Sequence, residues 1–450
     1  MQPATGLTNT GRIQRLAKAA AVKLVRAHEI ALDQIARISP RPSRHWRAYK
    51  ARLRRGRLRN VIFIGVTGSC GKTTTAQLVG AVLSTTGECH VSAGRNGYSE
   101  VVASVLKIRP TTRFCVQELS GSAPGLLAPQ IRLLQPHIGI ITAIGTDHYK
   151  RFRSREATAQ EKGQLFERLA EDGTAIVNID DPYVCSLIGR TEACLLTIGT
   201  AADADLRAEA VASRWPERLT LTVCYRGESI HLQTRLVGEW WTTSVLAAIA
   251  CGLICGLDLK ACAQAVETFE TSVGRYSVHE VPGAATYILD HKAPFWTIAE
   301  SIDFIAAAGA IRKTIVFGTV SDYAGASSPR YRRLAREALA LSDRVLFVGP
   351  QAMHVSKLAA GWARGRLFCF PTTFHASEFL KAQTLQGELV LIKGSMATDH
   401  LERIFLSQLD RVVCWRSGCG RSNACPDCRK YHRPFAPESG RSNSKLGIQA

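Results

Sequence analysis

Apolar residues along the chain fall into short, β-branched runs separated by segments of helical length. Runs of this kind are typical of parallel strands that are buried on both faces. We predict strands over 61–66, 114–116, 138–143, 175–177 and 193–198, and again over 287–289, 314–317, 344–348, 367–370 and 389–392. Because helix-length segments lie between these runs, the sequence predicts an α/β fold with mostly parallel, doubly wound sheets.

Residues 205–235 depart from this pattern. Apolar and polar residues alternate over 219–223, and a second run over 228–232 could pair with the first, so a small antiparallel patch is expected there. Helices over 243–255 and 259–269 then close the first α/β region.

The first sixty residues are helical in pattern and basic. Apolar residues recur every three or four positions over 13–38, which predicts an amphipathic helix that ends before Pro40. The next segment, 44–59, alternates Arg and Lys with Trp46 and Tyr49. It is interpreted as a second helix that packs on the body, or as an arm for an acidic or lipid surface.

Charge is concentrated at the two ends of the chain. Of the net charge of +20, residues 1–60 carry +13 and residues 411–450 carry +6, so the 350 residues between them are nearly neutral. A nucleic-acid-binding protein usually spreads its charge over a folded face, so nucleic acid is not the expected partner. The positive charge of the two ends instead suggests that they bind an anionic partner or a partner subunit.

Length and composition set further limits. A chain of 450 residues is long enough for two or three domains. It has no apolar run long enough to span a membrane and no secretory signal, so we expect a soluble cytoplasmic protein.

The clearest chemical signal is a glycine-containing turn between the first strand and a helix. A turn of this kind points backbone N–H groups at phosphate oxygens, and the helix dipole adds to the attraction. The strict phosphate-loop pattern would need glycine at position 66, where this chain has Val66, so the loop is a variant. We assign nucleotide binding to Thr67, Gly68, Ser69, Cys70, Gly71, Lys72, Thr73 and Thr74.

From about residue 61 to 404 the chain resembles the Mur ligase family of ATP-dependent amide-bond ligases, and within it the ligases that add D-alanyl-D-alanine to a muramoyl tripeptide. The resemblance rests on the phosphate loop and on motifs that follow in the family's order. These motifs are Gly94-Arg95-Asn96-Gly97, Glu118, Thr146-Asp147-His148, the Glu161–Phe166 stretch with Lys162, Asn178–Pro182, Gly274-Arg275, Asp290 and Lys393-Gly394-Ser395.

The resemblance implies specific roles for these residues. Lys72 would contact the β- and γ-phosphates of ATP, and Thr73 and Glu118 would hold Mg²⁺. His148 would hold a second Mg²⁺, with Lys162 as a carbamoylated lysine beside it. Arg275 and Asp290 would contact the nucleotide.

The implied reaction joins a carboxylate to an amine. The γ-phosphoryl group would first convert the carboxylate to an acyl phosphate, which the amine then attacks, releasing phosphate. Two other interpretations stay open: a P-loop NTPase that acts on nucleic acid, and a degenerate family member that serves as a scaffold subunit.

Several family features are altered. The segment over 238–244 lacks the histidine and both asparagines of the family's G-x-H-N-x-x-N pattern, and the segment after Asp290 is shorter than usual. A segment of about sixty residues with a net charge of +13 stands where the cell-wall enzymes have a sugar-nucleotide-binding domain. A conventional muropeptide substrate is therefore not expected.

Four cysteines cluster near the end of the chain. Cys414, Cys419, Cys425 and Cys428 follow a C-x₄-C-x₅-C-x₂-C spacing in a short polar region. Four thiolates suit a tetrahedral Zn²⁺. A tail this small needs a cross-link such as a bound metal ion to fold. His432 could replace one ligand, and an iron–sulfur cluster or free thiols are the alternatives.

These signals divide the chain into four parts. We expect a basic helical segment (1–59), an ATP-binding central domain (60–272), a Rossmann-like C-terminal domain (273–410) and a Cys-rich, zinc-binding tail (411–450).

Overall fold

The structure is a computed structural model that describes residues 44–94, 96–396, 398–421, 424–429 and 431–432. The helix expected over 13–38 lies outside the described residues. The chain divides into two compact units between Arg57 and Leu58. The described part of the first unit is helix α2 (Arg44–Arg57), as predicted, and its Trp46 and Tyr49 rings stack with centroids 5.6 Å apart.

A nine-stranded sheet forms the first half of the larger unit, in the order β2-β3-β1-β4-β5-β6-β7-β8-β9. The strands from β2 to β7 in this order are parallel, whereas β8 and β9 are antiparallel to their neighbours, as the alternating segments predicted. The strands are β1 (Ile62–Thr67), β2 (Cys89–Ser92), β3 (Phe114–Glu118), β4 (Ile138–Ile141), β5 (Thr174–Asn178), β6 (Cys194–Gly199), β7 (Leu206–Ala212), β8 (Thr220–Tyr225) and β9 (Glu228–Gln233).

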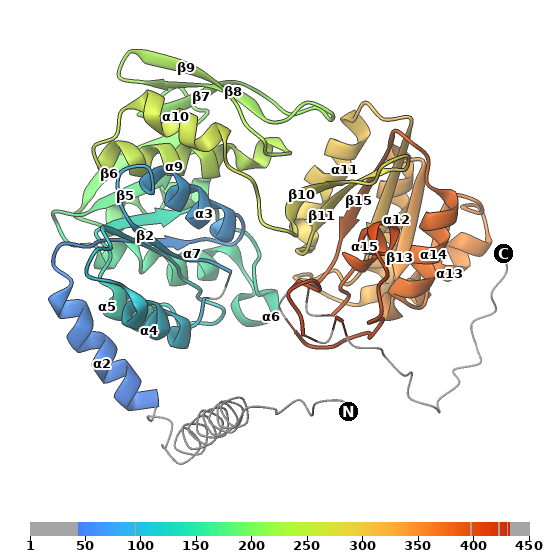
Figure 1. Ribbon diagram of the computed structural model, residues 1–450, viewed down its shortest axis with the longest axis horizontal. Helices are drawn as coiled ribbons and strands as arrows, with labels where there is room; N and C mark the ends of the chain where they lie inside the picture. Colours follow the sequence, from blue (N-terminus) through green and yellow to red (C-terminus); the bar gives the residue numbers. More distant parts are fainter. Residues whose placement is uncertain (1–43, 95, 397, 422–423, 430, 433–450) are drawn as a thin grey trace, which may run out of the picture. The chain divides into compact units, whose positions relative to one another are not determined.

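Helices cover both faces of this sheet. Figure 1 shows α3, α9 and α10 along one face and α4 and α5 along the other. The helices are α3 (Lys72–Leu83), α4 (Tyr98–Lys107), α5 (Ala128–Leu134), α6 (Tyr149–Phe152), α7 (Arg155–Gly163), α8 (Pro182–Cys185), α9 (Thr242–Ile254) and α10 (Leu259–Glu267). This is the doubly wound arrangement that the sequence predicted.

A six-stranded sheet forms the second half, in the order β10-β11-β15-β12-β13-β14, with β10 antiparallel to β11 and the others parallel. Its strands are β10 (Arg275–Glu280), β11 (Thr286–Asp290), β12 (Arg312–Phe317), β13 (Arg344–Val348), β14 (Leu367–Phe370) and β15 (Glu388–Lys393). Its helices are α11 (Ile298–Ala307), α12 (Ser327–Leu341), α13 (Ser356–Ala360), α14 (Thr373–Gln383) and α15 (Arg403–Leu409).

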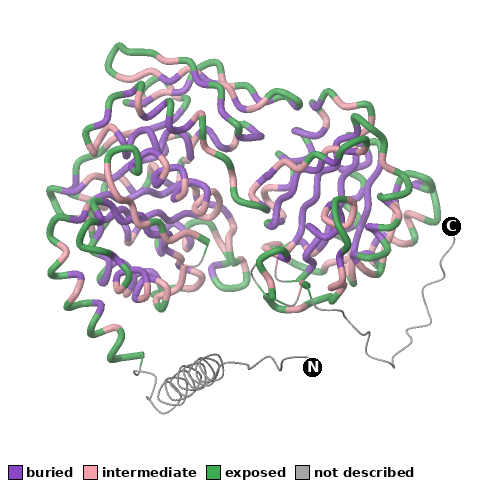
Figure 2. Tube along the Cα trace, viewed as in Figure 1, coloured by how far each residue is buried: buried purple, intermediate pink, exposed green. Residues whose placement is uncertain are grey.

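Successive side chains of a strand point to opposite faces, and the second sheet buries both. Ile315 and Phe317 pack in one apolar cluster, which includes Leu334 of α12. Val316, between them, packs in another cluster with Leu380 of α14. Figure 2 shows buried segments at the centre of both sheets, where β3, β4, β13 and β15 are buried along their whole length. Burial on both faces explains why these strands are uniformly apolar in sequence.

Three strands were not predicted. β2, β7 and β10 lie at or near sheet edges, and polar residues interrupt their sequences, so they lack a continuous apolar run. The charged helix that begins at Arg155 ends at Gly163 and is followed by a separate 3₁₀ turn. None of the described helices is long and apolar enough to cross a membrane.

Candidate active site

The glycine-containing loop follows β1 and leads into α3, as the sequence predicted. Gly68 has a φ of 146°, and a Cβ at this position would lie 1.9 Å from Thr142 Oγ1. Gly71, at the N-cap of α3, has a φ of 74°. A side chain at position 68 would clash with Thr142, so this position requires glycine for a steric reason, whereas the positive φ at position 71 favours glycine through the backbone alone.

The loop is fixed to the segment that follows β4. The Ser69 N–H donates to the Ala143 carbonyl (2.8 Å), and the Gly145 N–H donates to Ser69 Oγ (2.9 Å). Thr142 Oγ1 donates to the Cys70 carbonyl (2.6 Å). Because these contacts hold the loop in place, its shape does not have to form when a ligand binds.

Lys72 is the first residue of α3 and lies at the loop. Its Nζ donates to the carbonyls of Gly68 (2.7 Å) and Ser69 (3.4 Å). The amino terminus of this twelve-residue helix adds the positive end of the helix dipole. A cation, a helix amino terminus and a glycine-shaped loop together make an anion-binding site suited to a polyphosphate.

Burial makes the thiol of Cys70, in the middle of the loop, a weak nucleophile. Burial raises the pKa of its thiol to about 12, and the nearby Lys72 charge lowers it by less. The thiol is therefore protonated near neutral pH, and Cys70 serves as a structural member of the loop.

The end of β3 places Glu118 beside this loop. Thr73 Oγ1 donates to Glu118 Oε2 (2.9 Å), and the Gly94 N–H donates to the same oxygen (2.6 Å). Asn96 Nδ2 donates to the other oxygen (2.6 Å). The carboxylate is 2% exposed. A buried carboxylate and a hydroxyl side by side at a phosphate loop are donors that Mg²⁺ prefers, so these residues fit the predicted magnesium site.

Asp147 lies between His148 and Lys162, two residues that are predicted to be catalytic. Its Oδ2 lies 3.5 Å from Lys162 Nζ, and its Oδ1 lies 3.5 Å from His148 Nε2. Burial alone would raise the pKa of Asp147, but Lys72, Lys162 and His148 lower it below its usual value. Burial lowers the pKa of His148, which favours the neutral imidazole that binds metals. A carboxylate oxygen of Asp322 belongs to the same group of potential ligands.

Lys162 is almost completely buried near the end of α7, with 1% of its surface exposed. Burial, and then the neighbouring Lys72 charge, lower the pKa of its amine to about 8. A substantial fraction of the amine is therefore neutral at physiological pH, and the neutral amine is the form that reacts with CO₂.

The lowered pKa of Lys162 gives a testable effect on stability. The folded state loses this proton near pH 8, whereas the unfolded chain keeps it until about pH 10.4. The lysine therefore destabilises the fold below pH 8, and its contribution becomes less unfavourable as the pH rises from 8 to about 10. We expect the free energy of unfolding of the wild type, relative to Lys162→Met, to rise across this range in urea titrations. A difference that stays constant with pH would contradict the lowered pKa.

Two predicted nucleotide contacts, Arg275 and Asp290, make hydrogen bonds within the second half of the chain. The Asp290 carboxylate accepts from Lys393 Nζ (2.6 Å), which also donates to Tyr276 Oη (2.8 Å). The Arg275 guanidinium donates to the Gly274 carbonyl (3.3 Å). Both residues lie at the adjoining ends of β10 and β11, and their roles in nucleotide binding stay predictions.

Three residues of the site were missed as functional in the sequence. Thr142 shapes the loop, Asp147 links His148 to Lys162, and Asp322 reaches the same group from the second half of the chain. Thr142 and Asp147 follow β4, so their position at the end of a parallel strand beside the phosphate loop was an available signal. Asp322 is distant in sequence, and no local pattern indicates it.

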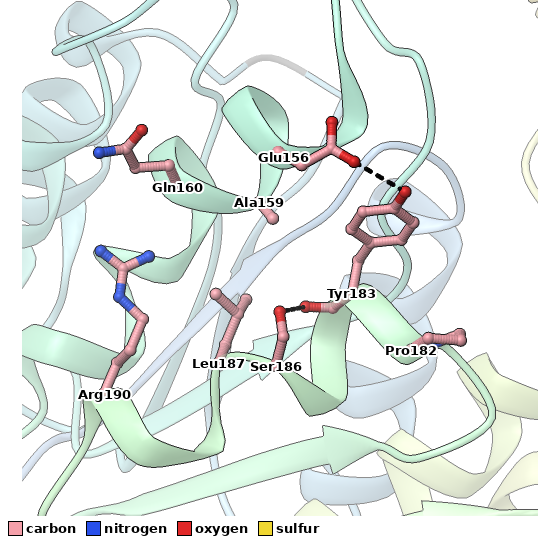
Figure 3. Close-up of a pocket in the computed structure, with 8 residues that line it drawn as sticks. All are labelled: Glu156, Ala159, Gln160, Pro182, Tyr183, Ser186, Leu187 and Arg190. Atoms are coloured by element: carbon pink, nitrogen blue, oxygen red, sulfur yellow. Dashed lines mark hydrogen bonds between the residues drawn. The ribbon is translucent and has the colours of Figure 1, made fainter.

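A pocket of about 410 Å³ lies elsewhere, between α7 and α8 (Figure 3). Tyr183 Oη donates to Glu156 Oε1 (3.0 Å) at its edge. The lining residues are Glu156, Ala159, Gln160, Pro182, Tyr183, Ser186, Leu187 and Arg190. None of the predicted site residues is among them, so this pocket is not the candidate active site.

The four tail cysteines are not assembled as expected. In the part of the chain that the structure describes, the groups of three or more potential ligands are Asp147, His148 and Asp322, and His400, Glu402 and Cys425. Cys425 and Cys428 share one turn, in which the Cys428 N–H donates to the Cys425 carbonyl (3.0 Å). Cys419 instead contacts His400. A zinc site made of Cys414, Cys419, Cys425 and Cys428 therefore stays a prediction, and the turn before α15 adds His400 and Glu402 as further donors beside Cys425.

Comparison with known families gives a match to the Mur ligase middle domain over residues 66–252. The chain is 27% identical over 366 residues to the UDP-N-acetylmuramoyl-tripeptide–D-alanyl-D-alanine ligase of Mycobacterium leprae, covering 74% of this chain and 70% of the relative. It is also 27% identical to the ligase of the same name from Bacillus subtilis, covering 74% of this chain and 72% of the relative.

Solved structures share the fold. A crystal structure of MurF from Acinetobacter baumannii superposes with a TM-score of 0.74 at 22% identity, covering 82% of this chain and 81% of that one. The MurF ligase of Thermotoga maritima in complex with ADP superposes with a TM-score of 0.66 at 18% identity, covering 81% of each chain.

Proposed function

Because this chain belongs to the Mur ligase family and is an ATP-dependent carboxylate–amine ligase, we propose that residues 67–74, Glu118, His148 and Lys162 form its active site. The observation that carries this assignment is the hydrogen bond between Thr73 and Glu118, next to Lys72 on the phosphate loop. This contact brings a hydroxyl and a carboxylate together beside the lysine, which supports binding of Mg²⁺ and of the β- and γ-phosphates at this loop.

The proposed reaction has two steps. A carboxylate oxygen of the first substrate attacks the γ-phosphorus of ATP, the bond to the β-phosphate oxygen breaks, and ADP leaves. The amine then attacks the acyl carbon, the bond from that carbon to the phosphate oxygen breaks, and the amine loses a proton. Both steps bring anions together, so their rates depend on positioning and on neutralisation of charge.

The side chains contribute to positioning and to charge neutralisation in different ways. Lys72 donates to phosphate oxygens in place of the loop carbonyls that it now contacts. Thr73 and Glu118 would hold Mg²⁺, which when bound neutralises the charge on the β- and γ-phosphates. His148 and Asp147 would hold a second Mg²⁺. A carbamate on Lys162 would add a negative charge that orients this second site.

Replacing Glu118 with glutamine tests the magnesium assignment. The amide keeps the size of the side chain but removes the charge, so we expect the Mg²⁺ concentration for half-maximal ATP turnover to rise at least about 10-fold. The matched control is Glu171→Gln, which makes the same change at an exposed position. An unchanged Mg²⁺ requirement in Glu118→Gln, measured by ADP release, would exclude Glu118 as a magnesium ligand.

We further propose that the carboxylate substrate is a peptidoglycan precursor. The relatives named above are ligases that join UDP-N-acetylmuramoyl-tripeptide to D-alanyl-D-alanine. Incubating the enzyme with ATP, Mg²⁺ and pooled precursors and amines, followed by mass spectrometry, identifies the pair by a product equal to their sum minus water.

The remaining expectations concern location and partners. We expect the reaction to take place in the cytoplasm, where ATP and the substrates of the related ligases are found. The basic helix α2, with three arginines in its last turn, would bind an anionic partner or a partner subunit. A structural zinc ion would bind in the tail, in addition to the Mg²⁺ ions of the active site.

A further inference from the structure

A cluster of buried donor side chains lies outside the candidate active site, where the tail meets the second sheet. His400 and Glu402 belong to the turn before α15, and Cys425 belongs to the tail. One potential ligand atom of each lies within 4.8 Å of the other two. We propose that His400, Glu402 and Cys425 bind one Zn²⁺ ion, a ligand set that takes two of its three members from the turn before α15.

The distances fit one tetrahedral zinc. His400 Nδ1 lies 3.6 Å from Cys425 Sγ and 3.2 Å from Glu402 Oε1. Zinc bonds of about 2.05 Å to nitrogen and about 2.3 Å to sulfur, at the tetrahedral angle, separate the two donors by about 3.6 Å. For nitrogen and oxygen the separation is about 3.4 Å. The two pairs that include His400 therefore need shift little to share an ion, and the Glu402 oxygen and the Cys425 sulfur lie within 4.8 Å of each other.

The environment of Glu402 also indicates a missing cation. Its side chain is completely buried, and its Oε2 has no hydrogen-bond partner. His291 Nε2 lies 3.2 Å from this oxygen and forms an ion pair with it when the imidazole is protonated, and a neutral His291 would leave the carboxylate without a cation. Buried polar atoms are nearly always paired because leaving one unpaired is costly. A divalent cation beside Glu402 would satisfy the carboxylate.

Neighbouring groups already orient the ligands. The Cys419 thiol lies 2.9 Å from His400 Nε2, the ring nitrogen that faces away from Cys425. If Nε2–H donates to this sulfur, the lone pair of Nδ1 is directed at Glu402 and Cys425. The Cys425 N–H also donates to Glu402 Oε1 (3.0 Å), which fixes the tail against the turn.

This chemistry selects zinc and a structural role. A set of one imidazole, one thiolate and one carboxylate suits a borderline-soft ion that accepts N, S and O donors. His400 follows Asp399, whose carboxylate accepts from the N–H groups of Thr319 and Ser395, after β12 and β15. A zinc ion bound here would thus hold the tail against the segment at the end of β15 that contains Lys393-Gly394-Ser395.

The test is the zinc content of the full-length protein, measured by mass spectrometry after equilibration with Zn²⁺ and removal of excess metal. We expect about one zinc per wild-type chain, and loss of that zinc in His400→Ala and in Cys425→Ser. Cys419→Ser should bind zinc roughly 10- to 100-fold more weakly, because it removes a group that orients a ligand. Cys414→Ser and Cys428→Ser should keep full stoichiometry, as should Cys194→Ser, an exposed control.

Cobalt gives a second readout that does not depend on activity. Co²⁺ bound at the site should show a sulfur-to-cobalt absorption band in the wild type, which Cys425→Ser abolishes and Cys428→Ser keeps. Circular dichroism and ATP binding identify any variant that fails to fold. Glu402→Gln, which keeps the size of the side chain, serves as the second variant and should also lose zinc.

Two results would overturn the proposal. One is a protein that binds no zinc at micromolar concentrations with reduced thiols. The other is zinc that persists in His400→Ala but is lost in Cys414→Ser or Cys428→Ser, which would restore the four-cysteine set. Neither result affects the ligase assignment, because ADP release depends on the candidate active site and not on this zinc site.

Discussion

Replacing Lys72 with alanine is expected to lower ATP turnover by roughly 10²- to 10³-fold, the usual cost of removing one group that stabilises charge in a transition state. Lys72 is half-buried, and its Nζ contacts only loop carbonyls among the described residues, so the change removes a cation without opening a core cavity. The thermal unfolding midpoint should therefore change little. The measurement is ADP release with saturating Mg²⁺.

Lys107→Ala is the matched control, because it removes an exposed lysine at the end of α4. It should leave turnover unchanged. Near-normal ADP release from folded Lys72→Ala would show that the loop over residues 67–74 does not bind the phosphates.

Replacing Lys162 with alanine should lower turnover about 10²-fold, because the second metal position would lose the group that orients it. If the lysine carries a carbamate, formate or acetate can enter the space left by the side chain and restore part of the activity. Lys162→Arg should be as inactive as the alanine variant, since arginine keeps a positive charge and cannot be carbamoylated.

Two observations would contradict this account of Lys162. One is full activity in Lys162→Ala with no response to added carboxylates, with Lys260→Ala as the exposed control. The other is rescue by Lys162→Arg, which would mean that the side chain acts through a positive charge.

The phosphate loop and the strands around it could be predicted because their signals are local. Buried parallel strands are continuous apolar runs, and Thr67–Thr74 joins one such run to a helix. Glu118 could be placed beside this loop because β3 pairs with β1, and both strands end at the same edge. The family resemblance supplied the role of Glu118.

Other features depend on contacts between distant segments. The strands β2, β7 and β10 are set by pairing with neighbours and carry no apolar run of their own. The tail cysteines have a zinc-like spacing, but their partners are decided by the turn that places His400 and Glu402 against Cys425. Spacing within the tail contains no information about that turn.

The central claim is that the enzyme activates a carboxylate by transferring phosphate to it, and isotope transfer tests this claim most directly. The enzyme is incubated with ATP, Mg²⁺, amines and peptidoglycan precursors whose carboxylates carry ¹⁸O. We predict ADP together with phosphate that contains one ¹⁸O atom, because a carboxylate oxygen leaves with the phosphate when the amide forms. ADP with unlabelled phosphate, AMP with pyrophosphate, or ATP cleavage that responds only to added nucleic acid would contradict it.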